Sequence, residues 1–367
     1  MNKKIGKIEI YRFYICVTII IGHLFNNLSI DDYKVSVLTI NNKFSLGVEF
    51  FLIISGFFIA TSAFKSKATN LSKQTIIYTV KRIRSFFSEH FISSLFTLLI
   101  FLIYKKPSSL YSFAQIIIRF IPTLLLFTRW GFNEIIMDIE WYLSCLIICG
   151  GVLYFLILKY KHSFSRIAAP FLALILMCSY FPIENSYHSA TIFVFNGFIH
   201  GNVVRSFSGM MIGVFIYEIV SYVQRQNINH KYKLFLSLIE IILLLICFYI
   251  KNQTNKKYEL LYIMLLSISL IIILSNISLT NKYFNNPICM HLGKLSLSMY
   301  LVQYASIYIT NMLYEYIKNG ILAALICVVL CIIFAEIINI LSKKIIFVFD
   351  KVLKEFLDIN DFYNVVK

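Results

Sequence analysis

The sequence predicts an all-α fold in which about ten helices cross a membrane. Of the 367 residues, 59% are hydrophobic and only 14% are charged, whereas a soluble domain carries roughly 25% charged residues. Long apolar runs such as 234–250 and 321–333 contain almost no charge, and they do not alternate as the strands of an outer-membrane barrel do. This composition excludes a soluble enzyme, a disordered chain and a disulfide-rich secreted domain.

Ten segments are long and apolar enough to be spans, since a helix needs about 20 mostly apolar residues to cross a bilayer. In chain order we expect spans at residues 8–27, 44–64, 86–104, 141–158, 167–182, 204–222, 234–250, 259–279, 295–313 and 320–341. A further apolar stretch, 111–128, is interrupted by Arg119 and Pro122. We interpret it as an interfacial or re-entrant element that does not cross.

The distribution of Lys and Arg sets the expected orientation, because cytoplasmic loops of membrane proteins are enriched in these residues. With 111–128 not crossing and the N-terminus inside, the inner segments hold more than twice as many Lys and Arg as the outer ones. If 111–128 crossed, the basic 159–166 loop would face outward. We therefore expect both termini in the cytoplasm, a transmembrane domain over 1–341 and a short cytoplasmic tail over 342–367. The net charge of +16 then reflects topology and membrane lipids, and no nucleic-acid partner is expected.

The cysteines form no recognisable metal-binding pattern. Nearly all of the eight cysteines lie inside apolar segments, and no CxxC pair occurs. Cys289 and His291 share one loop, but two ligands are too few for a structural zinc site. We expect the cysteines to be packing residues and no metal to be bound.

Arg12 and His23 are ionisable residues inside the first predicted span. Charges within spans are costly, so they are usually paired or functional. The two residues are eleven positions apart, which places them on one helical face, about 16 Å apart along the axis. Arg12 alone could simply extend its charge to the cytoplasmic interface. His23 lies in an Ile-rich run, and for it a functional role is favoured.

The second span contains Glu49 and a Ser55-Gly56 pair. Glu49 could pair with an Arg or His of a neighbouring helix, or it could reach the interface. Ser55-Gly56 permits close helix approach, so packing explains this pair as well as function does. Glu218 and Glu240 also lie in or near spans, but the sequence identifies no partner for them.

Lys81, Arg82 and Arg84 form a compact basic cluster before the third span. Judged by residue type alone, the cluster is best explained by attraction to anionic lipids. The functional interpretation is a phosphate site, because Arg matches phosphate in a bidentate manner. Together with His23, the cluster fits acyl transfer from a cytoplasmic acyl-CoA. The basic groups would hold the phosphates, and His23 would deprotonate an acceptor hydroxyl or transiently take the acyl group.

These motifs resemble those of the membrane-bound acyltransferase 3 family, which O-acylates cell-surface carbohydrates from acyl-CoA. The spacing from Arg12 to His23 matches the family's pattern of Arg, ten residues and His. Residues 47–57 closely follow its G-V-D/E-x-F-F-x-x-S-G-F motif. Lys81 and Arg84 occupy the basic positions of an R-x-x-R-x-x-P motif, in which Phe87 here replaces the Pro.

The resemblance continues through the rest of the chain. Residues 141–143 look like the family's W-x-L motif, and 207–210 are similar to a later F-x-G-x motif. Residues 293–303 resemble G-x-x-S-x-x-x-Y-L-x-H, except that Gln303 stands where the family commonly has His.

The resemblance implies an O-acyltransferase, in its leading form an O-acetyltransferase, of the bacterial inner membrane. It uses acyl-CoA as co-substrate, has no bound cofactor, and acts on a surface polysaccharide or lipid-linked glycan. The implied catalytic residues are His23, Arg12 and Glu49, the acyl-CoA contacts are Lys81, Arg82 and Arg84, and the substrate-site candidates are Ser55, Trp141, Tyr300 and Gln303.

Two alternative functions remain open at the level of the sequence. One is a transporter or flippase for a lipid-linked glycan, although inverted repeats and broken helices, which are common in transporters, are not evident. The other is transfer of a larger acyl group such as succinyl.

Overall fold

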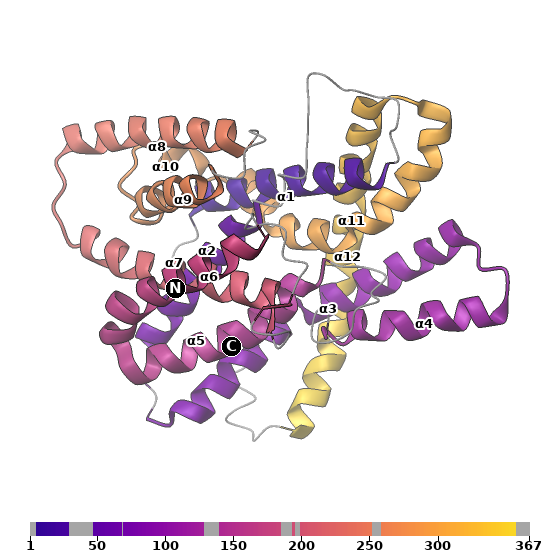
Figure 1. Ribbon diagram of the computed structural model, residues 1–367, viewed down its shortest axis with the longest axis horizontal. Helices are drawn as coiled ribbons and strands as arrows, with labels where there is room; N and C mark the ends of the chain where they lie inside the picture. Colours follow the sequence, from indigo (N-terminus) through magenta and orange to yellow (C-terminus); the bar gives the residue numbers. More distant parts are fainter. Residues whose placement is uncertain are drawn as a thin grey trace. The chain divides into compact units, whose positions relative to one another are not determined.

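The computed structural model describes residues 5–28, 47–67, 69–127, 139–184, 193–194, 199–251 and 258–356, and this part of the chain is almost entirely helical (Figure 1). The helices are α1 (Gly6–Asn27), α2 (Gly47–Lys65), α3 (Leu71–Lys105), α4 (Leu110–Leu124), α5 (Trp141–Ser163), α6 (Ala169–Glu184), α7 (Gly201–Val223), α8 (His230–Lys251), α9 (Glu259–Leu274), α10 (Asn281–Phe284), α11 (Pro287–Ile317) and α12 (Gly320–Phe356). A short antiparallel pair, β1 (Phe193–Val194) and β2 (Ile199–His200), precedes α7. The predicted all-α class is confirmed.

Each predicted span overlaps a helix, and several helices are long and apolar enough to cross a membrane. Residues 44–46 of the second predicted span lie outside the described residues, and 275–279 lie beyond the end of α9. Among the described residues six helical segments are long and apolar enough: α1, α2, α3, α5 with α6, α7 and α12. Helix α9 is shorter than predicted and has 16 residues. The count of ten spans and the side on which the termini lie stay predictions.

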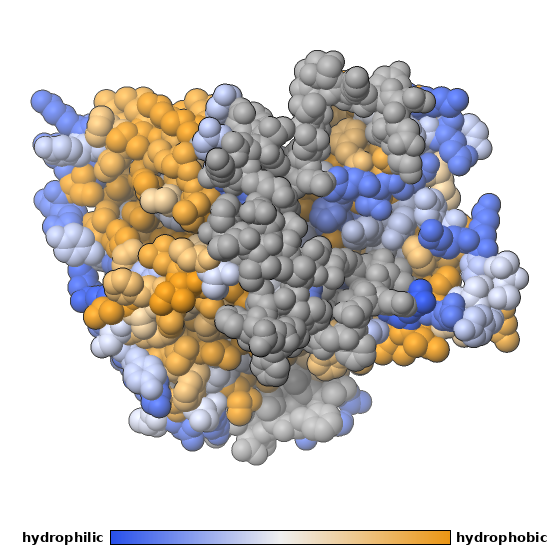
Figure 2. Space-filling view, in the orientation of Figure 1, coloured by the Kyte–Doolittle hydropathy of each residue, from blue (hydrophilic) through white to orange (hydrophobic). Residues whose placement is uncertain are grey.

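Helix α8 is not among these six segments, but its surface is apolar. Large hydrophobic side chains such as Leu234, Leu238 and Leu245 are exposed on it. Apolar surface also covers the region of α8 and α9 in the space-filling view (Figure 2). Exposed apolar surface of this extent indicates contact with lipid or with another protein, which supports the predicted span at 234–250.

Helix α4 covers most of the 111–128 stretch. Its N-terminus is capped by Ser109, whose Oγ accepts a hydrogen bond from the Ser112 backbone N–H at 3.2 Å, and Pro122 lies in its last turn. Its 15 residues extend about 22 Å, less than the roughly 30 Å of a hydrocarbon core. Phe120 packs on Leu98 of α3. This length agrees with the interpretation that 111–128 does not cross.

The predicted 159–166 loop is instead a break in a helical run. Lys161 has a φ of 46°, outside the helical region, and a π-helical turn (Phe164–Ala168) then leads directly into α6. The chain therefore breaks between two helices at Lys161, within the predicted connection, while the residues on either side of the break remain helical. The break is shorter than the predicted loop, because hydropathy marks where apolar character stops but not where the backbone leaves the helix.

The chain forms two compact units, and some helices contribute to both. The first unit comprises Met1–Ile15, Leu38–Leu71 and Ile148–Lys294, and the second comprises Cys16–Val37, Ser72–Ile147 and Leu295–Lys367. Helix α12 continues through residue 341 to Phe356, so the predicted tail begins within a helix.

In the first unit α2 and α7 pack with their backbones in contact at glycines. A Cβ on Gly56 would lie 1.9 Å from the Met210 carbonyl oxygen, and one on Gly213 would lie 1.9 Å from the Ile53 carbonyl oxygen. Small residues allow helices in a membrane to approach this closely. The structure therefore gives Gly56 the packing role that was one of its two predicted interpretations.

The core of the second unit lies where α11 meets α3 and α12. Val302, Ala305 and Ile338 are buried there, and the rings of Phe96 and Phe334 meet edge to face with centroids 4.9 Å apart. This packing fixes the α11 segment that carries the predicted Tyr300 and Gln303.

Candidate functional site

Glu49 of α2 and Arg205 of α7 form a buried ion pair in the first unit. Arg205 Nε donates to Glu49 Oε1 at 2.6 Å, and the two side chains are 4% and 1% exposed. Gly209 allows close packing beside this pair, because a Cβ there would lie 3.0 Å from Leu52 Cβ. Of the two predicted fates of Glu49, the structure shows pairing with a neighbouring helix. The sequence assigned Arg205 no role, although its place inside an apolar span was a signal.

The first turn of α1 is fixed by a buried lysine. Lys7 Nζ donates to the two carboxylate oxygens of Glu240 in α8 at 2.7 and 2.9 Å and to Ser278 Oγ at 3.0 Å. Both charged side chains are 1% exposed. The Gly6 backbone N–H donates to Asn285 Oδ1 at 2.9 Å. These contacts set the position of α1 in the first unit, and with it the position of Arg12.

Arg12 lies beside Glu9 and the ring of Phe58. Its Nη1 is 3.4 Å from Glu9 Oε2, its guanidinium carbon is 5.9 Å from the Phe58 centroid, and the side chain is 31% exposed. A hydrogen bond at 3.4 Å is long, so the guanidinium keeps donors available for an anion. Gly293, the first residue of the late motif, packs on the same turn, since a Cβ there would lie 2.7 Å from Glu9 Cα.

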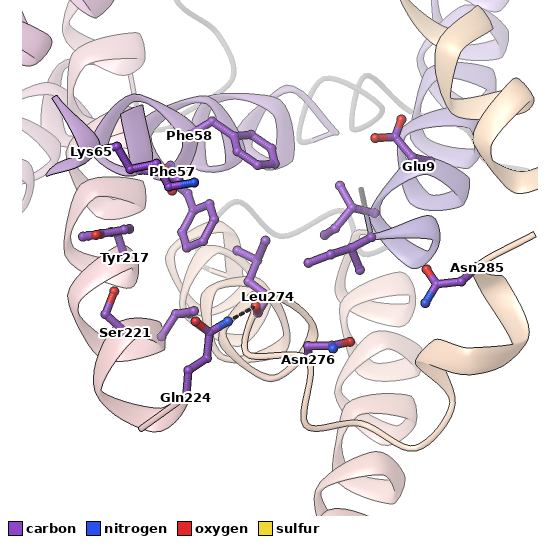
Figure 3. A pocket seen from close by; sticks show the side chains of 14 residues that line it. Glu9, Phe57, Phe58, Lys65, Tyr217, Ser221, Gln224, Leu274, Asn276 and Asn285 are labelled. Carbon is purple, nitrogen blue, oxygen red and sulfur yellow. Dashed lines mark hydrogen bonds between the residues drawn. The ribbon is translucent and has the colours of Figure 1, made fainter. Parts of the chain in front are cut away.

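A cavity of about 410 Å³ opens next to Glu9 and Phe58 (Figure 3). Figure 3 shows the rings of Phe57 and Phe58 on one side, and Gln224 with its hydrogen bond to the Leu274 carbonyl oxygen on another. The remaining polar lining comes from Thr61, Lys65, Tyr217, Ser221, Asn276 and Asn285. The residues that contact Arg12 are thus also walls of a cavity that could admit a small molecule. The sequence did not identify this cavity.

His23 is half-buried in the second unit, where it meets a tyrosine of α11. Its ring and that of Tyr304 meet edge to face, with centroids 5.9 Å apart and an interplanar angle of 67°. This contact restricts rotation of the imidazole. Tyr304 was not predicted, although it is the residue after Gln303 in the late motif. Arg12 and His23 both lie on α1, which is one continuous helix as their spacing predicted.

Tyr300 and Gln303 are fixed by hydrogen bonds in the second unit. Tyr300 Oη donates to the Ile139 carbonyl oxygen at 2.6 Å, and its ring meets that of Tyr142 at 6.2 Å. Gln303 is fully buried, and its Nε2 donates to the Tyr300 carbonyl oxygen at 2.8 Å. Its Oε1 has no hydrogen-bond partner among the described residues, so it is a buried acceptor. Trp141 lies edge-on to Tyr142 at 6.4 Å.

The basic cluster of α3 is partly occupied by a carboxylate. Arg84 Nε and Nη2 donate to the two oxygens of Asp350 in α12 at 2.6 and 2.7 Å. In contrast, Arg82 Nε is buried with no hydrogen-bond partner in the described part of the chain, and Lys81 is exposed. The guanidinium predicted to grip phosphate is therefore already held by a side chain that the sequence did not link to it.

Acids for which the sequence gave no partner are paired across helices. Glu218 of α7 lies 2.7 Å from His162 Nδ1 and accepts from Arg166 Nε at 3.0 Å and from Ser165.

The candidate Ser55 is buried in α2 beside Gly56. No group of three His, Cys, Asp or Glu suited to a metal occurs among the residues that the structure describes.

A family model described as an acyltransferase domain matches residues 5–340 of the chain. No curated protein and no solved structure matches the chain. The matched range includes Arg12, His23, Glu49, Arg84 and Gln303, so all of these lie inside the region that defines the family.

Breaking the Glu49–Arg205 pair should strongly destabilise the fold. Glu49→Leu or Arg205→Met alone leaves a buried charge without its partner, and we expect each to lower the free energy of unfolding by about 3–5 kcal/mol. The double variant should lose less than either single variant, because no unpaired charge remains. Equilibrium unfolding of the purified variants in detergent measures these changes in the free energy of unfolding.

The matched control is Arg166→Met, which removes a mostly exposed arginine from Glu218 while Ser165 and His162 remain. It should cost at most about 1 kcal/mol. If the losses of Glu49→Leu and Arg205→Met simply summed in the double variant, the pair would not be coupled as the geometry indicates.

Proposed function

Because the chain belongs to the acyltransferase 3 family, we propose that it is an integral membrane O-acyltransferase of the bacterial inner membrane. It moves an acyl group, acetyl in the leading form, from cytoplasmic acyl-CoA to a hydroxyl of a surface polysaccharide or lipid-linked glycan. The observation that carries this proposal is the family match over nearly the whole chain, with Arg12 and His23 on one continuous helix.

His23 is the proposed general base. The acceptor oxygen attacks the thioester carbonyl while a nitrogen of the neutral imidazole takes the hydroxyl proton. The C–S bond then breaks, and the imidazolium returns the proton to the leaving CoA sulfur. The edge contact with Tyr304 supports this role because it keeps the ring in one orientation. The other possibility is that His23 carries the acyl group transiently.

Arg12, Glu49 and the late motif have supporting roles in this proposal. Arg12 supplies a cation whose hydrogen bonds to the two carboxylate oxygens of Glu9 are both long, at 3.4 Å, so it can stabilise negative charge on the donor. Glu49 holds α2 against α7 through Arg205. Lys81, Arg82 and Arg84 are the proposed contacts of the CoA phosphates. Ser55, Trp141, Tyr300 and Gln303 are proposed to shape the acceptor side.

We also propose that both termini lie in the cytoplasm. Four separate segments of the chain meet around the cavity of the first unit, and they contribute Glu9, Lys65, Gln224 and Asn285. The distribution of Lys and Arg predicts all four segments to be cytoplasmic. Their convergence around one cavity supports a common side of the membrane for all four, and the excess of Lys and Arg makes that side the cytoplasm in this proposal.

The two alternative functions are weaker or separable. A flippase for a lipid-linked glycan is disfavoured by the match to an acyltransferase family. Transfer of a larger acyl group uses the same residues, and the mass added to the acceptor distinguishes it from acetyl transfer.

His23→Ala should abolish acyl transfer while the protein still accumulates in the membrane. A general base contributes about 10²- to 10⁴-fold to rate, so transfer of labelled acyl groups to glycan in membrane vesicles should fall by at least about 100-fold. Tyr304→Phe keeps the ring and is the matched control, with activity near that of the wild type.

Intact-mass measurement after rapid quenching separates the two roles of His23. An acyl adduct present on the wild type and absent from His23→Ala identifies a carrier, and its absence from both identifies a base. Near-full activity of His23→Ala would show that His23 has neither role.

Arg84→Ala and Asp350→Asn together test the donor role of Arg84. A charge-assisted phosphate contact is worth about 1.5–3 kcal/mol, so Arg84→Ala should weaken the apparent affinity for acyl-CoA by roughly 10- to 150-fold. Asp350→Asn removes the competing carboxylate and should leave that affinity unchanged or tighter. If both variants lowered thermal stability but left the donor affinity unchanged, the role of Arg84 would be structural, to hold α3 against α12.

A further inference from the structure

The cavity of the first unit has a lining in which neutral polar groups outnumber charges. Its hydrogen-bonding groups include the amides of Gln224, Asn276 and Asn285 and the hydroxyl of Ser221. Lys65 is the one cation in the described lining, and it is accompanied by the carboxylate of Glu9. Such a lining suits a neutral ligand that carries amides, and it does not suit a cluster of phosphates, which requires several cations.

Aromatic rings complete the walls of the cavity. Phe57 and Tyr217 lie with ring centroids 5.9 Å apart, and Tyr217 stacks on Phe64 at 4.9 Å and 18°. The Gln224 amide is oriented by its 3.2 Å hydrogen bond to the Leu274 carbonyl oxygen. The walls are therefore preformed by contacts within the protein, as is usual for small-molecule sites.

A lipid tail would be a poor occupant. One polar atom of each lining amide is already hydrogen-bonded within the protein: Asn276 Oδ1 to Asn281, Asn285 Oδ1 to Gly6 and Gln224 Nε2 to Leu274. Hydrocarbon offers no hydrogen bonds, so the other polar atom of each amide would lose water without compensation wherever a lipid tail covered it, at a cost of about 1–3 kcal/mol for each group. The volume of about 410 Å³ lies in the range of roughly 300–1,000 Å³ typical of small-ligand pockets.

We propose that this cavity receives the pantetheine arm of acyl-CoA. Pantetheine is a narrow chain with two amides, one hydroxyl and a pair of methyl groups, and it has no charge. Its amides match Gln224, Asn276 and Asn285, and its methyl groups match the rings of Phe57 and Tyr217. The phosphates remain outside the cavity. This inference rests on the proposed function, and it gives the pantetheine arm of the donor a site in the first unit, in addition to the basic residues proposed for the phosphates.

The position of the arm also gives Arg12 a defined task. Glu9 and Phe58 line the cavity and hold the guanidinium between them. A donor arm that fills the cavity would therefore pass beside Arg12, whose remaining donors can bind a carbonyl oxygen of the ligand. Arg12 then binds the donor, while Glu9 keeps the guanidinium of Arg12 in place.

Protection of a single cysteine tests the site with little risk to folding. Ser221→Cys places a thiol on the cavity wall, and Tyr222→Cys, its neighbour on α7, places one at a position that is 67% exposed and outside the lining. The rate of reaction with a small thiol reagent is measured for each purified variant in lipid nanodiscs, relative to the wild type with its native cysteines. Adenosine 3′,5′-bisphosphate, a fatty acid, CoA or pantetheine is added in turn at saturation. CoA and pantetheine are used throughout as their S-methyl thioethers, because their free thiols would consume the reagent.

CoA and pantetheine should each slow labelling at 221 by at least about tenfold and leave labelling at 222 unchanged. Adenosine 3′,5′-bisphosphate, which lacks the arm, should protect neither position. Direct binding of CoA to the wild type is measured in parallel. If CoA binds but does not protect 221, or if only the fatty acid protects it, the cavity is not the donor site, although the proposed function stands. Absence of CoA binding to the wild type would overturn the proposed function and this inference together.

Discussion

Charged groups that lipid cannot solvate must be paired inside the protein, and this constraint determines how the helices meet. Lys7 with Glu240 and Glu49 with Arg205 form ion pairs in which every side chain is at most 4% exposed. The desolvation of each charge is offset only where partner and geometry are both correct. Each pair therefore fixes one helix of the first unit against another, α1 against α8 and α2 against α7.

The proposed donor site follows from these two pairs. Lys7 sets the first turns of α1, and so places Glu9 on the cavity wall with Arg12 beside it. The α2–α7 contact brings Phe57 and Tyr217 together on the other side. The second unit supplies a different part of the proposed chemistry, because it carries His23 with Tyr304 and the buried acceptor oxygen of Gln303. Helix α1 carries both motif residues, Arg12 in the first unit and His23 in the second.

Helices and motif spacing could be predicted because they depend on neighbouring residues. Each apolar run predicted as a span overlaps a helix, and Arg12 and His23 lie on one helix, as their place in a single apolar run predicted. The partners could not be predicted in this way, because Glu49 and Arg205 are 156 positions apart and Arg84 and Asp350 are 266 apart. Such pairs depend on how helices pack. The 159–166 connection was predicted in the right place but too long, since hydropathy does not show that only the backbone at Lys161 leaves the helical region.

The central claim, that this membrane protein acylates a surface glycan, is tested most directly by mass analysis of the glycans themselves. Surface polysaccharide and lipid-linked glycan are isolated from cells that express the wild type, from cells that lack the gene, and from deletion cells that carry the gene again. The account predicts that one glycan loses a single acyl-sized mass, acetyl in the leading form, in the deletion and regains it on complementation. Identical glycan masses in all three strains, with the protein present in the membrane, would contradict it.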